Sequence, residues 1–243
     1  MTDTKIKLFG KVGTWVLLLV LPLSIASWIG LWLEPAVVPT VSTTEQPRPV
    51  LVLDPGHGGE DGGAVAADGT MEKELNLCIS QRMAAIADLL GWDTRLTRTN
   101  DAMLYDRYGP LPAGGKKKSY DLKNRLRFAE EAGATVFCSI HMNQFPDPDC
   151  RGLQVYYSQN AADSQRYATT VQNYAKAYLD PENQRAIKKA TSSIYLLHRI
   201  KTPAILIECG FLSSPTECAR LQDEVYQLQL AAVVVSGLCS SVP

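Results

Sequence analysis

Three polar residues of the chain follow short apolar runs, and their side chains could together bind a metal ion. They are His57, His141 and Glu208. His57 stands in a turn rich in glycine (residues 55–63), and such a turn bends the backbone tightly enough to present one ring. Imidazole together with a carboxylate suits zinc, and a catalytic zinc site keeps one position for water. We therefore interpret His57 as a metal ligand.

Each of these residues also has an ordinary interpretation. Glu208 directly follows residues 204–207, which are all apolar, and a carboxylate there is poorly solvated unless it pairs, binds a cation or is protonated. It could equally be a strand-end carboxylate that faces water. His57 alone fits a turn histidine, and His141 alone fits a core histidine. The third histidine, His198, has basic neighbours and is assigned a structural role.

A two-histidine site needs a carboxylate ligand and, separately, a base. Glu72 and Glu74 both stand at the start of the helix that is predicted after the glycine turn. Their alternative role is to complement the positive end of that helix. The pattern alone does not choose between them as the ligand.

Apolar runs and helical periodicities define the elements that must position these residues. Strands are expected at residues 49–53, 92–97, 135–140, 153–157, 194–197 and 204–207. Helices are expected at residues 75–90, 121–133 (capped by Asp121), 164–178 and 224–240, with a further one opening at a capping box in residues 214–217. Residues 100–120 are expected to form a long loop.

This alternation predicts a single α/β domain with a mostly parallel central sheet flanked by helices on both faces. In such sheets functional groups gather beyond the carboxyl ends of the strands. We therefore expect His57, His141 and Glu208 to meet at one edge. Their convergence is a stronger indication of function than any one motif.

Composition sets the class of protein. The chain has 243 residues, 46% of them hydrophobic, and a net charge of −1, so it can bury a full core and gives no global signal for nucleic acid. The lysine run at residues 116–118 is expected in a solvated loop. Six cysteines permit disulfides, but a domain of this size does not need them, and Cys78 and Cys138 are interpreted as small hydrophobes.

The N-terminal region is expected to stand apart from the domain. Residues 14–33 carry no charge and are mostly apolar, and about 20 such residues can span a bilayer. We interpret them as a transmembrane anchor or signal segment after a cytoplasmic N-terminus (1–13). A proline-containing linker (34–48) then leads to a catalytic domain (49–243). The domain is expected outside the cytoplasm, anchored to the membrane, or secreted if the segment is cleaved.

Four motifs in order resemble the zinc-dependent N-acetylmuramoyl-L-alanine amidases of the type-3 family. They are LDPGHGG (53–59), EKELNL (72–77), SIHMN (139–143) and IECGFLS (207–213). The resemblance extends over about residues 49–237. The short length, the single apolar segment and the stretches at 121–125 and 145–148 resemble, within that family, the membrane-anchored spore-cortex amidases of the CwlD type.

The resemblance implies the roles that the pattern leaves open. Zn²⁺ would be held by His57, Glu72 and His141, with Glu208 as the catalytic base and Asn143 orienting substrate or a ligand. The implied reaction is hydrolysis of the amide between N-acetylmuramic acid and L-alanine. The implied partners are the glycan strands and stem peptides of peptidoglycan, and the membrane through the N-terminal helix. No activating protein partner is identified by the sequence.

Three other functions are compatible with parts of the pattern. One is a zinc peptidase that acts on peptides without sugar. Another is a silent cell-wall-binding module, although such a module would be expected to lack a ligand or the base. A third treats residues 56–63 as a phosphate loop, which lacks the lysine followed by Ser or Thr that a P-loop requires. The family resemblance favours the amidase over all three.

Overall fold

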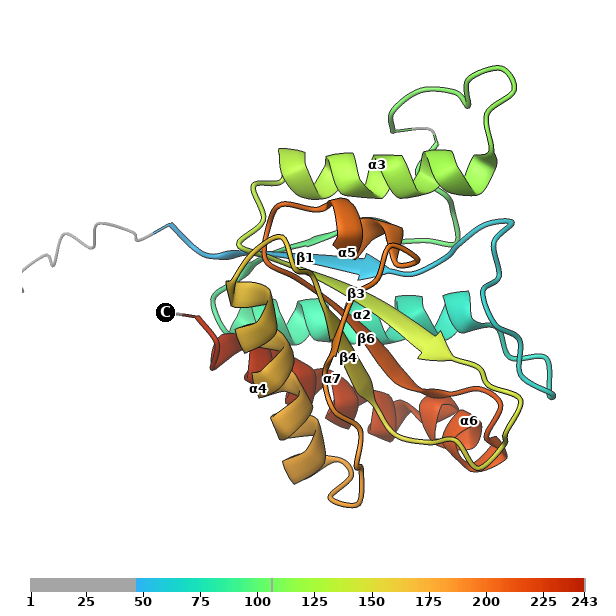
Figure 1. Cartoon of the computed structure of the whole chain (residues 1–243), viewed down its shortest axis with the longest axis vertical. Coiled ribbons are helices and arrows are strands. Elements are labelled where there is room, and N and C mark those ends of the chain that lie inside the picture. The colour runs from blue at the N-terminus through green and yellow to red at the C-terminus, as the bar shows by residue number, and fades with distance from the viewer. Residues whose placement is uncertain (1–46, 106, 243) are drawn as a thin grey trace, which may run out of the picture. The chain divides into compact units, whose positions relative to one another are not determined.

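Six strands of the described chain form one sheet, in the order β2-β1-β3-β6-β4-β5 (Figure 1). The computed structural model describes residues 47–105 and 107–242, so the segments predicted at residues 1–13 and 14–33, and most of the linker, lie outside the described residues. The strands are β1 (Val50–Pro55), β2 (Asp93–Leu96), β3 (Val136–Asn143), β4 (Gln154–Tyr157), β5 (Lys188–Lys189) and β6 (Ala204–Phe211).

The sheet is mostly parallel, as predicted. Strand β1 pairs in parallel with β2 and β3, and β3 pairs in parallel with β6. Strand β4 then runs antiparallel to β6, and the short β5 follows β4 in parallel. The carboxyl ends of β1, β3 and β6, the three strands that bear the predicted site residues, therefore lie side by side.

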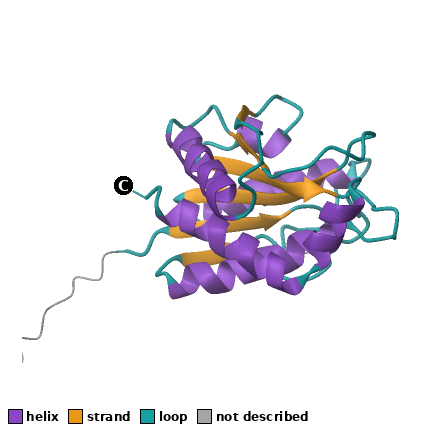
Figure 2. Cartoon of the chain, turned by 90° about the horizontal axis from the view of Figure 1, so that it is seen from below, coloured by secondary structure: helices purple, strands orange, loops and turns teal. Residues whose placement is uncertain are grey.

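Helices cover both faces of the sheet, which confirms the predicted layering (Figure 2). One face packs on α2 (Glu72–Leu89), α4 (Asp163–Tyr178), α6 (Pro215–Gln222) and α7 (Glu224–Cys239). The other face packs on α3 (Lys117–Glu131) and α5 (Tyr195–Arg199). None of the helices within these described residues is long and apolar enough to span a bilayer.

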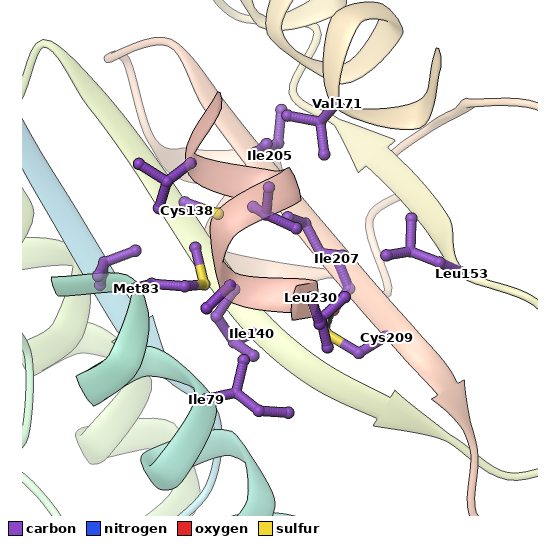
Figure 3. Close-up of a cluster of buried hydrophobic side chains, with 14 of the residues drawn as sticks. Ile79, Met83, Cys138, Ile140, Leu153, Val171, Ile205, Ile207, Cys209 and Leu230 are labelled. Atoms are coloured by element: carbon purple, nitrogen blue, oxygen red, sulfur yellow. Dashed lines mark hydrogen bonds between the residues drawn. The ribbon is translucent and has the colours of Figure 1, made fainter. Parts of the chain in front are cut away.

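The larger core lies between the sheet and α2, α4 and α7. Figure 3 shows Ile79 and Met83 of α2 packing toward Cys138 and Ile140 of β3. All four side chains are fully buried. Apolar residues spaced by four along α2 form one stripe of that helix, and alternate residues along β3 form one face of that strand. The two periodicities together produce this layer.

The opposite face of the same strands changes from apolar to polar along their length. Phe137 of β3 and Leu206 of β6 belong to the smaller core under α3 and α5. Because side chains two apart share a face, Ser139 and His141 follow Phe137, and Glu208 follows Leu206. The strand register pairs His141 directly with Glu208. This face of the sheet is therefore where chemistry is possible.

One predicted strand near the sheet edge is wrong, and one strand there was not predicted. The run at residues 194–197, predicted as a strand, instead belongs to α5, which buries Leu196 and Leu197 in the smaller core. Short apolar runs fit a strand or a buried helical turn equally well. The edge position beside β4 is taken by β5, whose two lysines are exposed and give no apolar signal.

The third helix begins earlier than predicted. Helix α3 starts at Lys117, so Asp121 does not cap it but lies buried inside it. There Asp121 accepts hydrogen bonds from the Leu104 amide and from Arg125 Nε. The lysine run is also not a free loop, because Lys117 and Lys118 lie in α3 and pair with Glu60 and Asp61.

Two smaller predictions are also corrected. Helix α6 opens at Pro215, but Ser214 makes no capping bond, and Glu217 instead accepts hydrogen bonds from the amides of Gly152 and Phe211. Cys138 is buried as expected, whereas Cys78 is exposed on α2, because it lies one position off the buried stripe. All six cysteines are free thiols.

Candidate metal centre

His57, Glu72 and His141 come from three separate elements and meet at one point. His57 follows β1, Glu72 is the first residue of α2, and His141 lies within β3. One possible ligand atom of each lies within 4.8 Å of the others. Glu72 Oε1 is 2.8 Å from His141 Nδ1 and 3.2 Å from His57 Nε2. The two imidazole rings meet edge to face, with centroids 5.0 Å apart.

This donor set fits zinc by chemistry and by spacing. Two imidazole nitrogens and one carboxylate oxygen are typical of a catalytic zinc site with a position left for water. Ligand atoms that each lie about 2.1 Å from a tetrahedral ion are about 3.4 Å apart. The two separations measured from Glu72 Oε1, 2.8 and 3.2 Å, are shorter than that value by no more than about 0.6 Å. The alternative carboxylate of Glu74 is exposed and stands outside the group.

Glycines make room for these side chains. A Cβ atom at Gly56 would lie 2.3 Å from Cε1 of His141. A Cβ atom at Gly63 would lie 2.5 Å from Glu72 Oε2 and 2.8 Å from His57 Cδ2. Gly63 also has a φ of +72°, which an L side chain rarely adopts. The glycine-rich turn therefore leaves room for the three side chains to pack around one point.

His57 itself has a strained backbone. Its φ of 62° is the one positive value at a non-glycine residue in the described chain. Such a conformation persists only where its surroundings fix it. Arg125 of α3 donates from Nη2 to the His57 carbonyl, and the amide of Gly58 donates to the carbonyl of Asp61 at 2.9 Å. These bonds hold the turn so that the ring points toward Glu72.

Buried charge lies directly beneath this turn. Arg125 donates from Nη1 to Asp54 Oδ1 at 2.7 Å and from Nε to Asp121 Oδ2 at 2.7 Å. Asp54 also accepts hydrogen bonds from the hydroxyls of Thr97 and Ser139. Burial alone would raise the pKa of Asp54, but Arg125 and these hydrogen bonds outweigh it and lower the pKa. Nothing in the sequence indicated this network beyond the aspartate that ends the first apolar run.

Glu72 is held as an ionised carboxylate. Its Oε2 accepts from the Ala64 amide at 2.7 Å, and its Oε1 accepts from the Met142 amide at 3.1 Å. Burial would raise the pKa of Glu72, but hydrogen bonds and the charges of His141 and His57 lower it far below its usual range. A carboxylate fixed in this way is preorganised to bind a cation.

Glu208 faces the same place from β6. The residue as a whole is partly exposed, but its Oε2 is buried and has no hydrogen-bond partner within the described residues. Burial raises the pKa of Glu208 above the ordinary glutamate value; His141 and His57 oppose that rise, and Glu72 adds to it. A carboxyl group with a raised pKa and a free oxygen is suited to accept and return a proton near neutral pH.

Comparison with known proteins assigns the family. Residues 51–240 match the sequence profile of the family described as Amidase_3, N-acetylmuramoyl-L-alanine amidase. The chain belongs to the type-3 N-acetylmuramoyl-L-alanine amidase family. Its catalysed reaction, hydrolysis of the amide between N-acetylmuramic acid and L-alanine in peptidoglycan, follows from that membership and from many curated relatives with this activity.

Two relatives match this amidase over most of their own length. It is 32% identical over 193 residues to the germination-specific N-acetylmuramoyl-L-alanine amidase of Bacillus subtilis, with 78% of each chain covered. It is 34% identical to the CwlD amidase of Clostridioides difficile, solved in complex with the GerS lipoprotein, with a TM-score of 0.74. That match covers 80% of this chain and 98% of the other. The amidase therefore resembles the CwlD-type enzymes, as the sequence indicated.

A second solved relative confirms the fold of the amidase more broadly. The AmiC2 amidase of Nostoc punctiforme is 32% identical, with a TM-score of 0.67 and coverage of 79% of this chain and 96% of that one. The two other residues considered in the sequence analysis are Asn143 and His198. Asn143 is the last residue of β3 and is half-exposed, and its Oδ1 accepts from the Gln144 amide. His198 is exposed on α5, apart from the histidine and glutamate cluster.

Proposed function

We propose that this amidase is a zinc-dependent hydrolase in which His57, Glu72 and His141 hold the metal ion. The observation that supports this most is the approach of two imidazole nitrogens and one carboxylate oxygen to within 4.8 Å, from three separate elements. The close spacing of Glu72 Oε1 to both rings and the glycines that make room for them add to it.

Glu208 is the catalytic base in this proposal. Zinc held in such a site would polarise a substrate carbonyl and would lower the pKa of a water molecule, so that the water loses a proton near neutral pH and becomes a nucleophile. The Glu208 carboxylate accepts a proton from the attacking water and passes it to the amide nitrogen of L-alanine. The carbon–nitrogen bond then breaks, leaving a carboxylate on the lactyl group of N-acetylmuramic acid and a free amine on the stem peptide. Asn143, half-exposed at the end of β3, orients the substrate.

Matched variants of the full chain test the two roles. Glu208→Gln should retain zinc and lose most of the hydrolysis of muropeptides, because only the proton acceptor is removed. His57→Ala should lose both zinc and activity. Zinc is measured by elemental analysis after dialysis, and hydrolysis by release of the stem peptide. Full zinc content in His57→Ala, or full activity in Glu208→Gln, would refute the corresponding role.

The substrate can be tested separately from the metal. Muropeptides and the same stem peptides without sugar are compared with the wild-type chain, with and without chelator. An amidase of this kind should cleave the muropeptide alone and should stop when zinc is removed. Equal cleavage of the free peptides would instead indicate a zinc peptidase.

We further propose that the enzyme acts on spore-cortex peptidoglycan and, like its C. difficile relative, binds a lipoprotein. The similarity to a germination-specific amidase and to CwlD supports this proposal. Spores of B. subtilis that lack the germination-specific amidase should regain germination when they carry the full chain. Failure with active, correctly located enzyme would contradict the cortex role. Binding of a lipoprotein is tested by purifying the enzyme from the cells that produce it. A lipoprotein should co-purify with the enzyme, and its absence would contradict this part of the proposal.

The enzyme is also proposed to work outside the cytoplasm, held at the membrane by residues 14–33. Cys78 gives a direct test, because it is the one exposed cysteine in the described domain. A membrane-impermeant maleimide should label Cys78 in intact cells, and Cys78→Ser should remove most of the label. Labelling only after lysis would place the domain in the cytoplasm.

A further inference from the structure

We propose that Asp61 is a positioning residue for His57, and that Lys118 of α3 holds Asp61 in place for this task. The inference rests on the proposed metal role of His57. In this role, the Asp61 carboxylate fixes the orientation of the His57 ring and determines which ring nitrogen carries the proton. No motif or spacing in the sequence indicated this role.

The two ring nitrogens of His57 face two different carboxylates. Nδ1 lies 2.9 Å from Asp61 Oδ2, and Nε2 lies 3.2 Å from Glu72 Oε1. A neutral imidazole carries its proton on one nitrogen and a lone pair on the other. With the proton on Nδ1, shared with Asp61, the Nε2 lone pair is free on the side where Glu72 and His141 stand. Asp61 therefore selects the form of His57 that can bind a cation.

The contact between His57 and Asp61 is close but bent. His57 Nδ1 is buried and has no well-aligned hydrogen bond among the described residues, although Asp61 Oδ2 stands at 2.9 Å. A small rotation of the ring or the carboxylate would align the two atoms. Metal-ligating histidines commonly donate their other N–H to a carboxylate, and loss of that partner weakens metal binding.

Asp61 is held from two sides. Its backbone forms reciprocal hydrogen bonds with Gly58, at 2.9 and 3.1 Å, which close the turn around His57. Its Oδ2 also lies 3.1 Å from Lys118 Nζ. Because α3 also supplies Arg125, which donates to the His57 carbonyl, one helix fixes both the backbone and the ring of the same residue.

The chain contains a matched control beside this pair. Glu60 precedes Asp61, Lys117 precedes Lys118, and Lys117 Nζ lies 2.6 Å from Glu60 Oε1. Both of these side chains are more than half exposed, at 70% for Glu60 and 52% for Lys117, and neither contacts His57. The two pairs join the same turn to the same helix end. Only the Asp61–Lys118 pair contacts the His57 ring. An effect that both pairs have on the turn therefore cancels when the zinc affinities of their variants are compared.

Zinc affinity of the full chain is the decisive readout, measured by competition with a chromophoric chelator. Asp61→Asn should weaken zinc binding about 10- to 100-fold, because the amide is a poorer partner for Nδ1–H. Glu60→Gln should bind zinc as the wild type does. Thermal unfolding of the metal-free chains controls for folding. Asp61→Asn that is folded and binds zinc as tightly as Glu60→Gln would overturn the inference.

A second pair of variants covers failure of Asp61→Asn to fold. Lys118→Met removes only the cation that holds Asp61, and Lys117→Met removes its neighbour. The first should weaken zinc binding several-fold more than the second. Equal affinities in this pair would likewise overturn the role of Lys118.

A spectroscopic readout separates positioning from general stability. The chain has three histidines, so ¹⁵N-labelled imidazoles can be assigned by substitution. In the zinc-loaded wild type the hydrogen on His57 Nδ1 should be shared with Asp61, and Asp61→Asn should shift the ¹⁵N resonance of Nδ1. An unchanged Nδ1 resonance would contradict the inference. If the wild type binds no zinc, or His57→Ala binds it fully, the proposed metal site fails and not the contact with Asp61.

Discussion

The two faces of the central sheet use the same strands for different purposes. On β3, Cys138 and Ile140 point into the core under α2, α4 and α7, while Ser139 and His141 point to the other side. The first face is apolar along the length of the strand. The second begins apolar at Phe137, under α3 and α5, and then turns polar. Neighbouring residues of the strand therefore serve the apolar core and the site in turn.

The site face has an exception to this separation. Arg125 is as deeply buried as the core side chains, and it joins Asp54 and Asp121 below the turn that carries His57. Chemistry at the rim of this face therefore depends on a charged network that also contributes to folding. Substitutions in the apolar core, at the site residues and in this network should therefore have different effects on stability and on catalysis.

The sharpest contrast between the faces is between two adjacent residues of β6. Glu208→Gln should lower kcat about 10²- to 10⁴-fold, because the proposed proton acceptor is lost. Cys209→Ala, one residue on and buried in the main core, should leave kcat unchanged and lower the free energy of unfolding by about 1 kcal/mol. Steady-state kinetics and urea unfolding measure the two effects. Similar effects of both substitutions on kcat would contradict the claim that only one face of the sheet contributes to catalysis.

The buried network should affect both properties at once. Arg125→Met leaves Asp54 and Asp121 without their cation, and breaking a buried pair in this way costs about 3–5 kcal/mol. The support of the His57 carbonyl is lost as well, so zinc affinity should fall together with stability. Urea unfolding of the metal-free chain and chelator competition measure the two losses. An unchanged free energy of unfolding would show that the network is not structural.

On the closed face, a large change in packing should leave the chemistry intact. Ile79→Ala removes a fully buried side chain of α2 and should lower the free energy of unfolding by about 2–5 kcal/mol. Below the unfolding transition, kcat and zinc content should match the wild type. A loss of kcat in folded protein would mean that the two faces are mechanically coupled.

The smallest expected effect is on how the free energy of unfolding of the metal-free chain depends on pH. Burial raises the pKa of Glu208 in the folded state, so folding favours the protonated carboxyl. Its favourable contribution is fully present below the unfolded pKa and is lost as pH rises through the raised folded pKa. Glu208→Gln, which stays neutral, should therefore match the wild type at about pH 3.5 and be more stable at about pH 8. Equal stabilities at both values would contradict the raised pKa.

The sequence predicted the central strands and the edge where the site residues meet. It did not predict which face of the sheet carries the site. Continuous apolar runs predicted β1, β3 and β6 and placed His57, His141 and Glu208 at neighbouring strand ends. Runs buried on both sides do not indicate which face is which. Glu72 and Glu74 both stand in the first turn of α2, and only the packing of that helix on the sheet shows which one faces the histidines.

Other features were invisible because they contradict local preferences. Two exposed lysines form β5, and a short apolar run forms α5 instead of a strand. Arg125 is a residue type that is rarely buried, so its burial depends on Asp54 and Asp121 arriving from elsewhere in the chain. The contact of Asp61 with His57 depends on a turn whose shape follows from several glycines together. Tertiary structure decides each of these cases.

The most direct test of the account is the location of zinc in crystals of the full chain, from anomalous scattering at the zinc absorption edge. The account predicts one strong peak about 2.1 Å from His57 Nε2, His141 Nδ1 and a carboxylate oxygen of Glu72, with Glu208 beside it but not bound to it. A peak elsewhere, or one in which any of these three side chains is too far away to bind the ion, would contradict it.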